Sequence, residues 1–126
     1  SIFRLSKEGI MNIEEIREYC IQRKGVTESF PFNETTLVFK VMNKMFCLLG
    51  LDNQRVSLKN DPDTNIELRA QFPAIYEGYH LHKQMWNTIE LNGTVPSKLM
   101  AQMIDESYDL IVASLTKKVQ EELKNL

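Results

Sequence analysis

Apolar residues recur with helical spacing at two places, near the start of the chain and over its last third. Asn12 and Glu15 have the spacing of a capping box, and isoleucines and a cysteine return on one face until a glycine ends the pattern. After Pro96, apolar residues again follow helical periodicity and could continue to Leu123. The pattern therefore predicts a helix over residues 12–24 and a long last helix that begins at Pro96.

Between these helices, the apolar residues lie in short runs rich in β-branched and aromatic side chains, which indicates strands. Three such runs follow one another, over residues 36–41, 44–51 and 55–59. The pairs Met42-Asn43 and Asp52-Asn53 separate them, and asparagine adopts the left-handed conformation that tight turns need. We therefore expect two consecutive antiparallel hairpins.

The remaining pattern adds a short helix and a further strand. Asp61 before Pro62 is typical of a helix start, and residues 86–91 alternate toward an Asn-Gly turn. The predicted order is helix, three strands, helix, strand and helix, without repeats or linkers. We expect a single α+β domain with an antiparallel sheet and flanking N- and C-terminal helices.

The N-terminus stands apart from this pattern. The chain begins with serine and its first methionine is Met11, so we expect residues 1–10 to be a cloning remnant or an upstream extension and residues 11–126 to form the domain. The first apolar stretch is too short and broken for a signal peptide. Cys20 and Cys47 have neither metal-ligand nor disulfide spacing. We expect a cytoplasmic protein with reduced thiols, no bound metal and no cofactor.

Composition and charge limit the partners of this chain. With 43% apolar and 25% charged residues, and no apolar run of membrane-spanning length, the chain is expected to be globular and to stay outside membranes. Its formal net charge of −2 gives no general attraction to nucleic acid or to anionic lipid. Residues 36–59 differ, because this segment has four basic residues and Asp52 as its single acidic residue. The basic residues are Lys40, Lys44, Arg55 and Lys59. Any binding of anions must come from this local patch.

The two hairpins predict which side chains share a face of the sheet. Two-residue loops place Phe39 opposite Phe46 and Cys47 opposite Leu58. One face is then the core, with Lys40 toward its edge, and carries Val38, Met45, Cys47, Leu49, Leu51, Val56 and Leu58. The other carries Leu37, Phe39, Val41, Phe46 and Leu48 with Lys44, Arg55, Ser57 and Lys59. Its rings could stack on bases while its cations meet phosphates, or a second layer such as the last helix covers the rings.

The densest group of polar and aromatic residues lies between residues 78 and 87: Tyr79, His80, His82, Lys83, Trp86 and Asn87. In a functional interpretation, Lys83 contacts phosphate, Trp86 stacks or wedges, and Asn87 reads a base edge. In a structural interpretation, the tryptophan belongs to the core, the histidine bonds to backbone and the asparagine satisfies loop amides. Both interpretations stay open at this point.

Four segments, in this order, resemble the MmcQ/YjbR proteins: FPFNETTLVFKVMNKMFCLL, SLKNDPD, GYHLHKQMWNTIELNG and SYDLIVASL. The resemblance runs from about Met11 to about Lys117. It implies a CyaY-like, frataxin-like fold and a DNA-binding role attributed to a double-wing arrangement of strands. By position, it places His80, Lys83, Trp86 and Asn87 in the family's His…Lys…His-Trp-Asn signature, and Lys40, Lys44 and Lys59 among its strand lysines. Met85 stands where the signature has its second histidine.

One main hypothesis and two alternatives follow. The first is a non-enzymatic DNA-binding protein of weak, salt-sensitive affinity that uses Lys40, Lys44, Arg55, Lys59, His80, Lys83, Trp86 and Asn87. The resemblance also implies a protein-interaction or metal-handling module that uses the acidic face of the first helix at Glu14 and Glu18. The third is a small-molecule pocket near residues 80–86, which a deep cavity there would favour. No catalytic motif occurs, and neither Ser107 nor Cys20 has an indicated base, so we expect no enzyme.

Overall fold

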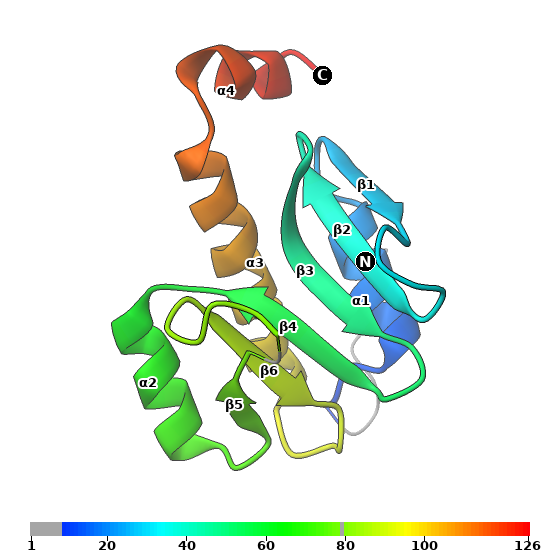
Figure 1. Cartoon of the computed structure of the whole chain (residues 1–126), viewed down its shortest axis with the longest axis vertical. Coiled ribbons are helices and arrows are strands. Elements are labelled where there is room, and N and C mark those ends of the chain that lie inside the picture. Colours follow the sequence, from blue (N-terminus) through cyan, green and yellow to red (C-terminus); the bar gives the residue numbers. More distant parts are fainter. Residues whose placement is uncertain (1–8, 79) are drawn as a thin grey trace.

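A six-stranded sheet in the order β1-β2-β3-β4-β6-β5 forms the centre of the computed structural model, and neighbouring strands in it are antiparallel (Figure 1). The structure describes residues 9–78 and 80–126. The strands are β1 (Val26–Ser29), β2 (Thr36–Val41), β3 (Lys44–Gly50), β4 (Arg55–Lys59), β5 (Ile75–Glu77) and β6 (Trp86–Glu90). The helices are α1 (Ile13–Ile21), α2 (Pro62–Gln71), α3 (Ser97–Ser114) and α4 (Lys117–Lys124). The predicted α+β class with an antiparallel sheet is confirmed.

The long helix α3 and the helix α1 pack on one face of the sheet, behind the strands in Figure 1. α3 contacts β2, β3 and β4, α1 contacts β1 and β3, and α2 contacts β5 and β6. α4 lies beside the β2–β3 hairpin, where Leu123 approaches Gly25 and the Met42 side chain lies near the same glycine. Within residues 9–78 and 80–126, every helix is too short or too polar to cross a membrane.

Short-range sequence signals determine where several elements begin. Asn12 Oδ1 accepts the Glu15 N–H at 2.8 Å and Glu15 Oε1 accepts the Asn12 N–H at 3.0 Å, which is the predicted capping box. Asp61 caps α2 by accepting a backbone N–H of its first turn at 3.0 Å. Met42 and Asn43 have φ angles of 49° and 71°. Both lie in the left-handed region, so the first predicted hairpin turn is confirmed.

A β-bulge makes the predicted pairing of Phe39 wrong, whereas Val41 lies opposite Lys44 as predicted. The register shifts between Phe39 and Lys40, so Phe39 lies opposite Cys47 and Phe46 becomes the extra residue. Because a one-residue slip exchanges the two faces of a strand, β2 is turned over relative to the prediction. Cys47 lies opposite Leu58, as predicted.

The covered face holds the core, including both phenylalanines that were predicted to lie among the cations. Phe39 and Phe46 are fully buried, and the Phe46 ring meets Tyr108 of α3 edge-on, with 5.4 Å between ring centroids. The interpretation of these rings as stacking platforms is therefore wrong, and α3 is the covering layer that the alternative named. The covered strand residues are Leu37, Phe39, Val41, Phe46, Cys47, Leu49, Val56, Leu58 and Ile89.

Several element boundaries differ from the pattern. The edge strands β1 and β5 were not predicted, and the second hairpin loop spans residues 51–54 instead of two residues. The first helix ends at Ile21, and the last helix ends at Ser114 before a separate α4, whose cap is Thr116. Residues 1–8 lie outside the described residues, so the predicted boundary after residue 10 stays a prediction.

Candidate functional site

The face of the sheet opposite α1 and α3, which we call the open face, gathers basic and polar side chains from four strands. Ladder partners define it, because Leu48 pairs with both Val38 and Ser57, and Ser57 pairs with Thr88. Its strand residues are Val38, Lys40, Met45, Leu48, Arg55, Ser57, Lys59, Trp86, Thr88 and Glu90. Arg55, Ser57, Lys59 and Leu48 were predicted to share a face. Val38, Lys40 and Met45 were predicted on the core face, and the bulge explains the difference.

A cavity of about 560 Å³ opens on this face, and we call it the sheet-face pocket. Side chains of β3, β4 and β6 line it, together with parts of three loops near residues 32–35, 52–53 and 80–81. Its lining includes Phe32, Asn33, Met45, Leu48, Asp52, Asn53, Arg55, Ser57, His80, Leu81 and Thr88. This volume lies in the range of small-ligand sites. The small-molecule alternative would be favoured by a deep cavity near residues 80–86, and this cavity reaches His80 and Leu81 of that segment.

The loop between β1 and β2 presents an aromatic ring at the pocket. Asn33 Oδ1 accepts the backbone N–H groups of Thr35 and Thr36 at 2.9 and 2.7 Å, an Asx-type turn that orders the loop. Phe32 lies next to this turn and is 63% exposed, while Phe30 on the same loop is 47% exposed. Large apolar side chains held out toward solvent beside a cavity are a marker of binding surfaces.

Two polar clusters lie on the open face within and beside the pocket. The hydroxyl oxygens of Ser57 and Thr88 lie 2.8 Å apart across β4 and β6 and share a buried hydrogen bond. Arg55 Nε lies 2.8 Å from Glu90 Oε2, which also accepts the Tyr76 hydroxyl. Burial and this hydrogen bond raise the pKa of Tyr76 to about 12. Arg55 is therefore held in place by a carboxylate, which offsets part of its charge.

The segment that connects β5 and β6 folds back over the end of β6. The Gly78 N–H donates to the Trp86 carbonyl at 2.9 Å, and a Cβ at Gly78 would lie 2.8 Å from Cβ of Trp86. Trp86 is only 6% exposed. His80 is exposed at a φ of 59°, a left-handed conformation that turns the chain at the pocket. Tyr79, named with this cluster, lies outside the described residues.

The predicted site residues do not all come together. Lys40, Arg55, Lys59 and Trp86 share the open face, and His80 lines its pocket. Lys44 lies exposed at the start of β3, and Lys83 lies exposed in the loop before β6.

Asn87 is on the covered side of the sheet, away from the other candidate residues. Its partner in the ladder is the core residue Leu58, and only 2% of Asn87 is exposed. Arg69 Nη1 donates to Asn87 Oδ1 at 2.8 Å, and Asn87 Nδ2 donates to the Asn65 carbonyl at 3.2 Å. In this conformation the amide cannot reach a base, and it ties α2 to β6 instead, in line with the structural interpretation.

Ser107 of α3 supports the open face from behind. The β3–β4 register would next pair Phe46 with Lys59, beyond the last ladder pair at Cys47 and Leu58. Ser107 Oγ is inserted there: it donates to the Phe46 carbonyl at 2.6 Å and accepts the Lys59 N–H at 2.9 Å. The hydroxyl therefore bridges β3 and β4 where their ladder ends and fixes the end of β4 that carries Lys59.

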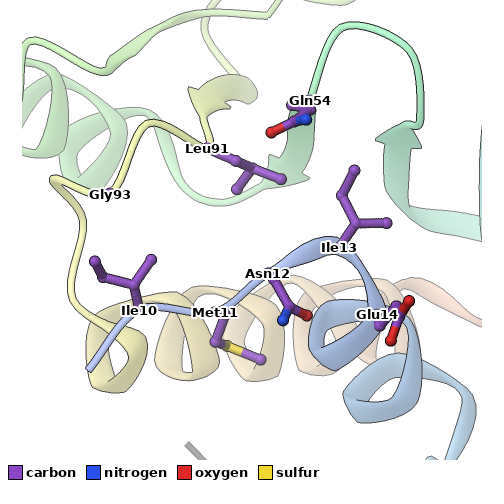
Figure 2. Close-up of a pocket in the computed structure, with 8 residues that line it drawn as sticks. All are labelled: Ile10, Met11, Asn12, Ile13, Glu14, Gln54, Leu91 and Gly93. Carbon is purple, nitrogen blue, oxygen red and sulfur yellow. The ribbon is translucent and has the colours of Figure 1, made fainter. Parts of the chain in front are cut away.

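A second cavity of about 430 Å³ lies where the chain enters α1 (Figure 2). Ile10 and Ile13 border it from the entering segment, and Leu91 and Gln54 border it from the opposite side (Figure 2). The amide of Asn12 also lines this cavity, but the capping box already uses it. The Asn12 amide therefore serves the helix start, and the sheet-face pocket, which gathers polar side chains from two neighbouring strands and three loops, is the better candidate site.

The acidic face of α1 does not form a dense carboxylate cluster. Glu14 and Glu18 are exposed, and Arg17 between them binds Glu28 of β1 through its guanidinium at 2.8 and 2.5 Å. In the part of the chain that the structure describes, no group of three or more His, Cys, Asp or Glu side chains is placed to hold a metal ion. No observation therefore favours the metal-handling alternative among these residues.

Sequence reasoning missed Phe32, Asn53, Tyr76 and Glu90 as residues at or beside the pocket. Phe32 carried a usable signal, since two phenylalanines flank a proline in an otherwise polar loop. Tyr76 and Glu90 carried none, because their contact joins β5 to the far end of β6 and depends on the sheet order.

Comparison with known proteins gives relatives along most of the chain. A family model described as YjbR matches residues 21–110. A protein named uncharacterized protein YjbR, from Escherichia coli strain K12, is 29% identical over 118 residues, which cover 92% of this chain and 100% of that protein. The uncharacterized protein YbdF of Escherichia coli O157:H7 is 26% identical over 113 residues, which cover 88% of this chain and 93% of that protein.

Solved structures support the same fold. A crystal structure from Deinococcus radiodurans, described as a DUF419 domain, has a TM-score of 0.86 at 36% identity and covers 92% of this chain and 90% of that chain. A Pseudomonas syringae protein has a TM-score of 0.67 at 24% identity and covers 79% of this chain and 98% of that chain. The second likeness concerns the fold alone.

Proposed function

The chain belongs to the YjbR family, and we propose that it binds nucleic acid weakly and in a salt-dependent manner through the open face of its sheet. A CyaY-like, double-wing description of the strands and a cytoplasmic location are parts of this proposal. The proposal includes no enzymatic step. The candidate nucleophiles are occupied or inaccessible: Cys20 and Cys47 are buried, burial raises the pKa of the Cys47 thiol, and Ser107 Oγ bonds to two backbone groups.

The observation that carries the proposal is that basic side chains and an exposed aromatic ring occur at the same face of the sheet. Lys40 of β2 and Arg55 and Lys59 of β4 lie on the open face, on strands that β3 separates. The exposed phenylalanine Phe32 lines the sheet-face pocket together with Arg55. A basic strip with an adjacent aromatic ring is the arrangement that single-strand binders use for backbone and base. The local excess of positive charge supports this binding against a molecular charge of −2.

The number of available cations limits the affinity. Glu90 holds Arg55, so we count Lys40 and Lys59 of the open face, together with the exposed loop residue Lys83, as the cations that meet phosphates. About three phosphate contacts correspond to a slope of about −2 for log K against log salt with a single strand, and about −3 with a duplex. Binding should therefore be detectable at low ionic strength and largely lost at high ionic strength.

Fluorescence anisotropy of labelled single-stranded and duplex DNA over a salt series tests the proposal. The double variant Lys40→Gln/Lys59→Gln should weaken binding and reduce the single-strand slope by about 1.4. The matched control, Lys98→Gln/Lys118→Gln, changes the same charge at two exposed lysines on α3 and α4 and should behave like the wild type. Equal losses in the two variants would show general charge attraction, and would place the binding elsewhere than the open face.

A gain-of-affinity variant sharpens the test. Glu90→Gln removes the carboxylate that holds Arg55 and should strengthen binding while making the salt slope steeper. Absence of binding by the wild-type protein at low salt to any strand would refute the proposal outright.

A further inference from the structure

We propose that the sheet-face pocket receives one unstacked nucleobase of the bound strand, while the lysines outside it hold the flanking phosphates. This inference rests on the proposed function and adds the chemical group that the pocket recognises. The pocket of about 560 Å³ is large enough for a small ligand and too small for a folded partner.

The distribution of charge separates the pocket from its surroundings. Arg55 and Asp52 both line the pocket, so opposite charges balance within it. Lys40 and Lys59 do not line the pocket, but each lies next to a residue that does. Lys40 pairs with Met45, and Lys59 follows Ser57 on the same face of β4. A neutral base suits the balanced interior and phosphate oxygens suit the lysines around it. A phosphate in the pocket would face the Asp52 carboxylate.

The apolar surfaces of the pocket suit a flat ring. Leu48 and Met45 contribute apolar side chains from β3, and Phe32 contributes an aromatic ring that is 63% exposed. Stacking of a base on an aromatic ring occurs in single-strand binders without a requirement for one particular base. The Asn33 turn orders the loop, which lowers the entropy that Phe32 would lose on binding.

The polar groups of the pocket suit the edge of a base. A Cβ at Gly50 would lie 2.0 Å from Asn53 Oδ1, so only glycine there lets the Asn53 amide lie against the strand where it lines the pocket. An amide offers both a donor and an acceptor, which matches the edge of a base. The hydrogen-bonded hydroxyl groups of Ser57 and Thr88 add a polar site to the pocket lining on β4 and β6.

Two neighbouring phenylalanines provide the test. Phe32→Ala should lower the affinity for a single-stranded oligonucleotide by about 5- to 150-fold, the range expected for loss of one stacked base, with an unchanged salt slope. Phe30→Ala is the control, because Phe30 is exposed on the same loop but does not line the pocket. An unchanged slope is the critical readout, since loss of a phosphate contact would reduce it.

Amide chemical shifts of the labelled protein give a second, independent readout with mononucleotide probes. Adenosine and uridine monophosphate should shift the signals of Leu48, Asn53 and Ser57, and ribose 5-phosphate should not. Shifts of these signals by ribose 5-phosphate alone would overturn the assignment of a base to the pocket.

The outcomes distinguish this inference from the proposed function. If Phe32→Ala and Phe30→Ala bind like the wild type while Lys40→Gln/Lys59→Gln loses affinity, the base pocket is refuted and binding by the open face stands. If the wild-type protein binds no strand at all, the proposed function fails first, and the pocket assignment fails with it.

Discussion

Replacement of Ser107 by alanine removes the hydroxyl that joins α3 to two strands of the sheet. Ser107 is fully buried, and its Oγ bonds to the Phe46 carbonyl and the Lys59 N–H at 2.6 and 2.9 Å. Both backbone groups lie just beyond the last β3–β4 ladder pair, Cys47 and Leu58, so they are not paired in the ladder. The variant would leave a buried acceptor and a part-buried donor without this partner.

The expected cost follows from these two bonds. Each hydrogen bond contributes about 1 kcal/mol net, and a buried group left without a partner costs about 1–3 kcal/mol. Alanine recovers about 0.5 kcal/mol of helix propensity in the middle of α3. The free energy of unfolding should therefore fall by about 2–4 kcal/mol, a large part of the about 5–15 kcal/mol that stabilises a domain.

Urea unfolding followed by circular dichroism measures this change. With a slope of about 2 kcal/mol per molar urea, the midpoint should fall by about 1–2 M. Ser114→Ala on the same helix is the matched control, since Ser114 is exposed and its Oγ donates only to the Ile111 carbonyl of its own helix. That variant should stay within about 0.5 kcal/mol of the wild type.

A local readout accompanies the global one. The Lys59 amide should exchange its hydrogen faster in Ser107→Ala than in the wild type, because its acceptor is gone. A loss of stability below about 0.5 kcal/mol, or unchanged exchange at Lys59, would refute the bridging role of the hydroxyl.

Two more predictions concern the edges of the molecule. Gly25→Ala should lower stability by about 1–3 kcal/mol, because Gly25 has a φ of 75° and a Cβ there would lie 2.5 Å from Leu123 Cδ1. Gly9→Ala is the control for the backbone effect, since Gly9 has a φ of 71° and no atom lies within 4 Å of its Cβ position. Thermal unfolding compares the two variants, and equal losses of stability would contradict the contact between Gly25 and α4. The raised pKa of Tyr76, about 12, favours the neutral phenol in the folded state, so this stabilisation is complete below about pH 10 and is lost as pH rises through about 12. Absorbance titration should show a late-ionising tyrosine that Tyr76→Phe removes, and an unaltered titration curve would contradict the assignment.

The parts of the fold that followed from sequence depend on contacts between near neighbours. The capping box needs only Asn12 and Glu15, three positions apart, and the first hairpin turn needs only two residues that tolerate positive φ. The start of α2 at Asp61 is of the same kind. Such contacts form within one turn of chain, so the order of residues is sufficient to predict them.

The candidate site was predicted only in part for the same reason. Arg55, Ser57 and Lys59 alternate along one strand, and strand alternation alone was enough to put them on one face. The buried position of Asn87 depends on Arg69 and Asn65 of α2, and the position of Trp86 depends on a close approach of Gly78. The pocket itself needs three loops brought together by the sheet order, which no local pattern expresses.

The sequence by itself therefore determined the class of fold, most of its elements and the sign of the charge along the central strands, because these depend on composition and short-range periodicity. The tertiary structure decided which face of β2 is buried. The bulge turns Phe39 and Phe46 toward the helices and Lys40 toward the open face. At this bulge, Ser107 Oγ bonds to the carbonyl of Phe46, which lies 61 positions away in the sequence. A one-residue slip exchanges every side chain of a strand between the faces, and here packing of a distant helix, which no local pattern records, accompanies that slip.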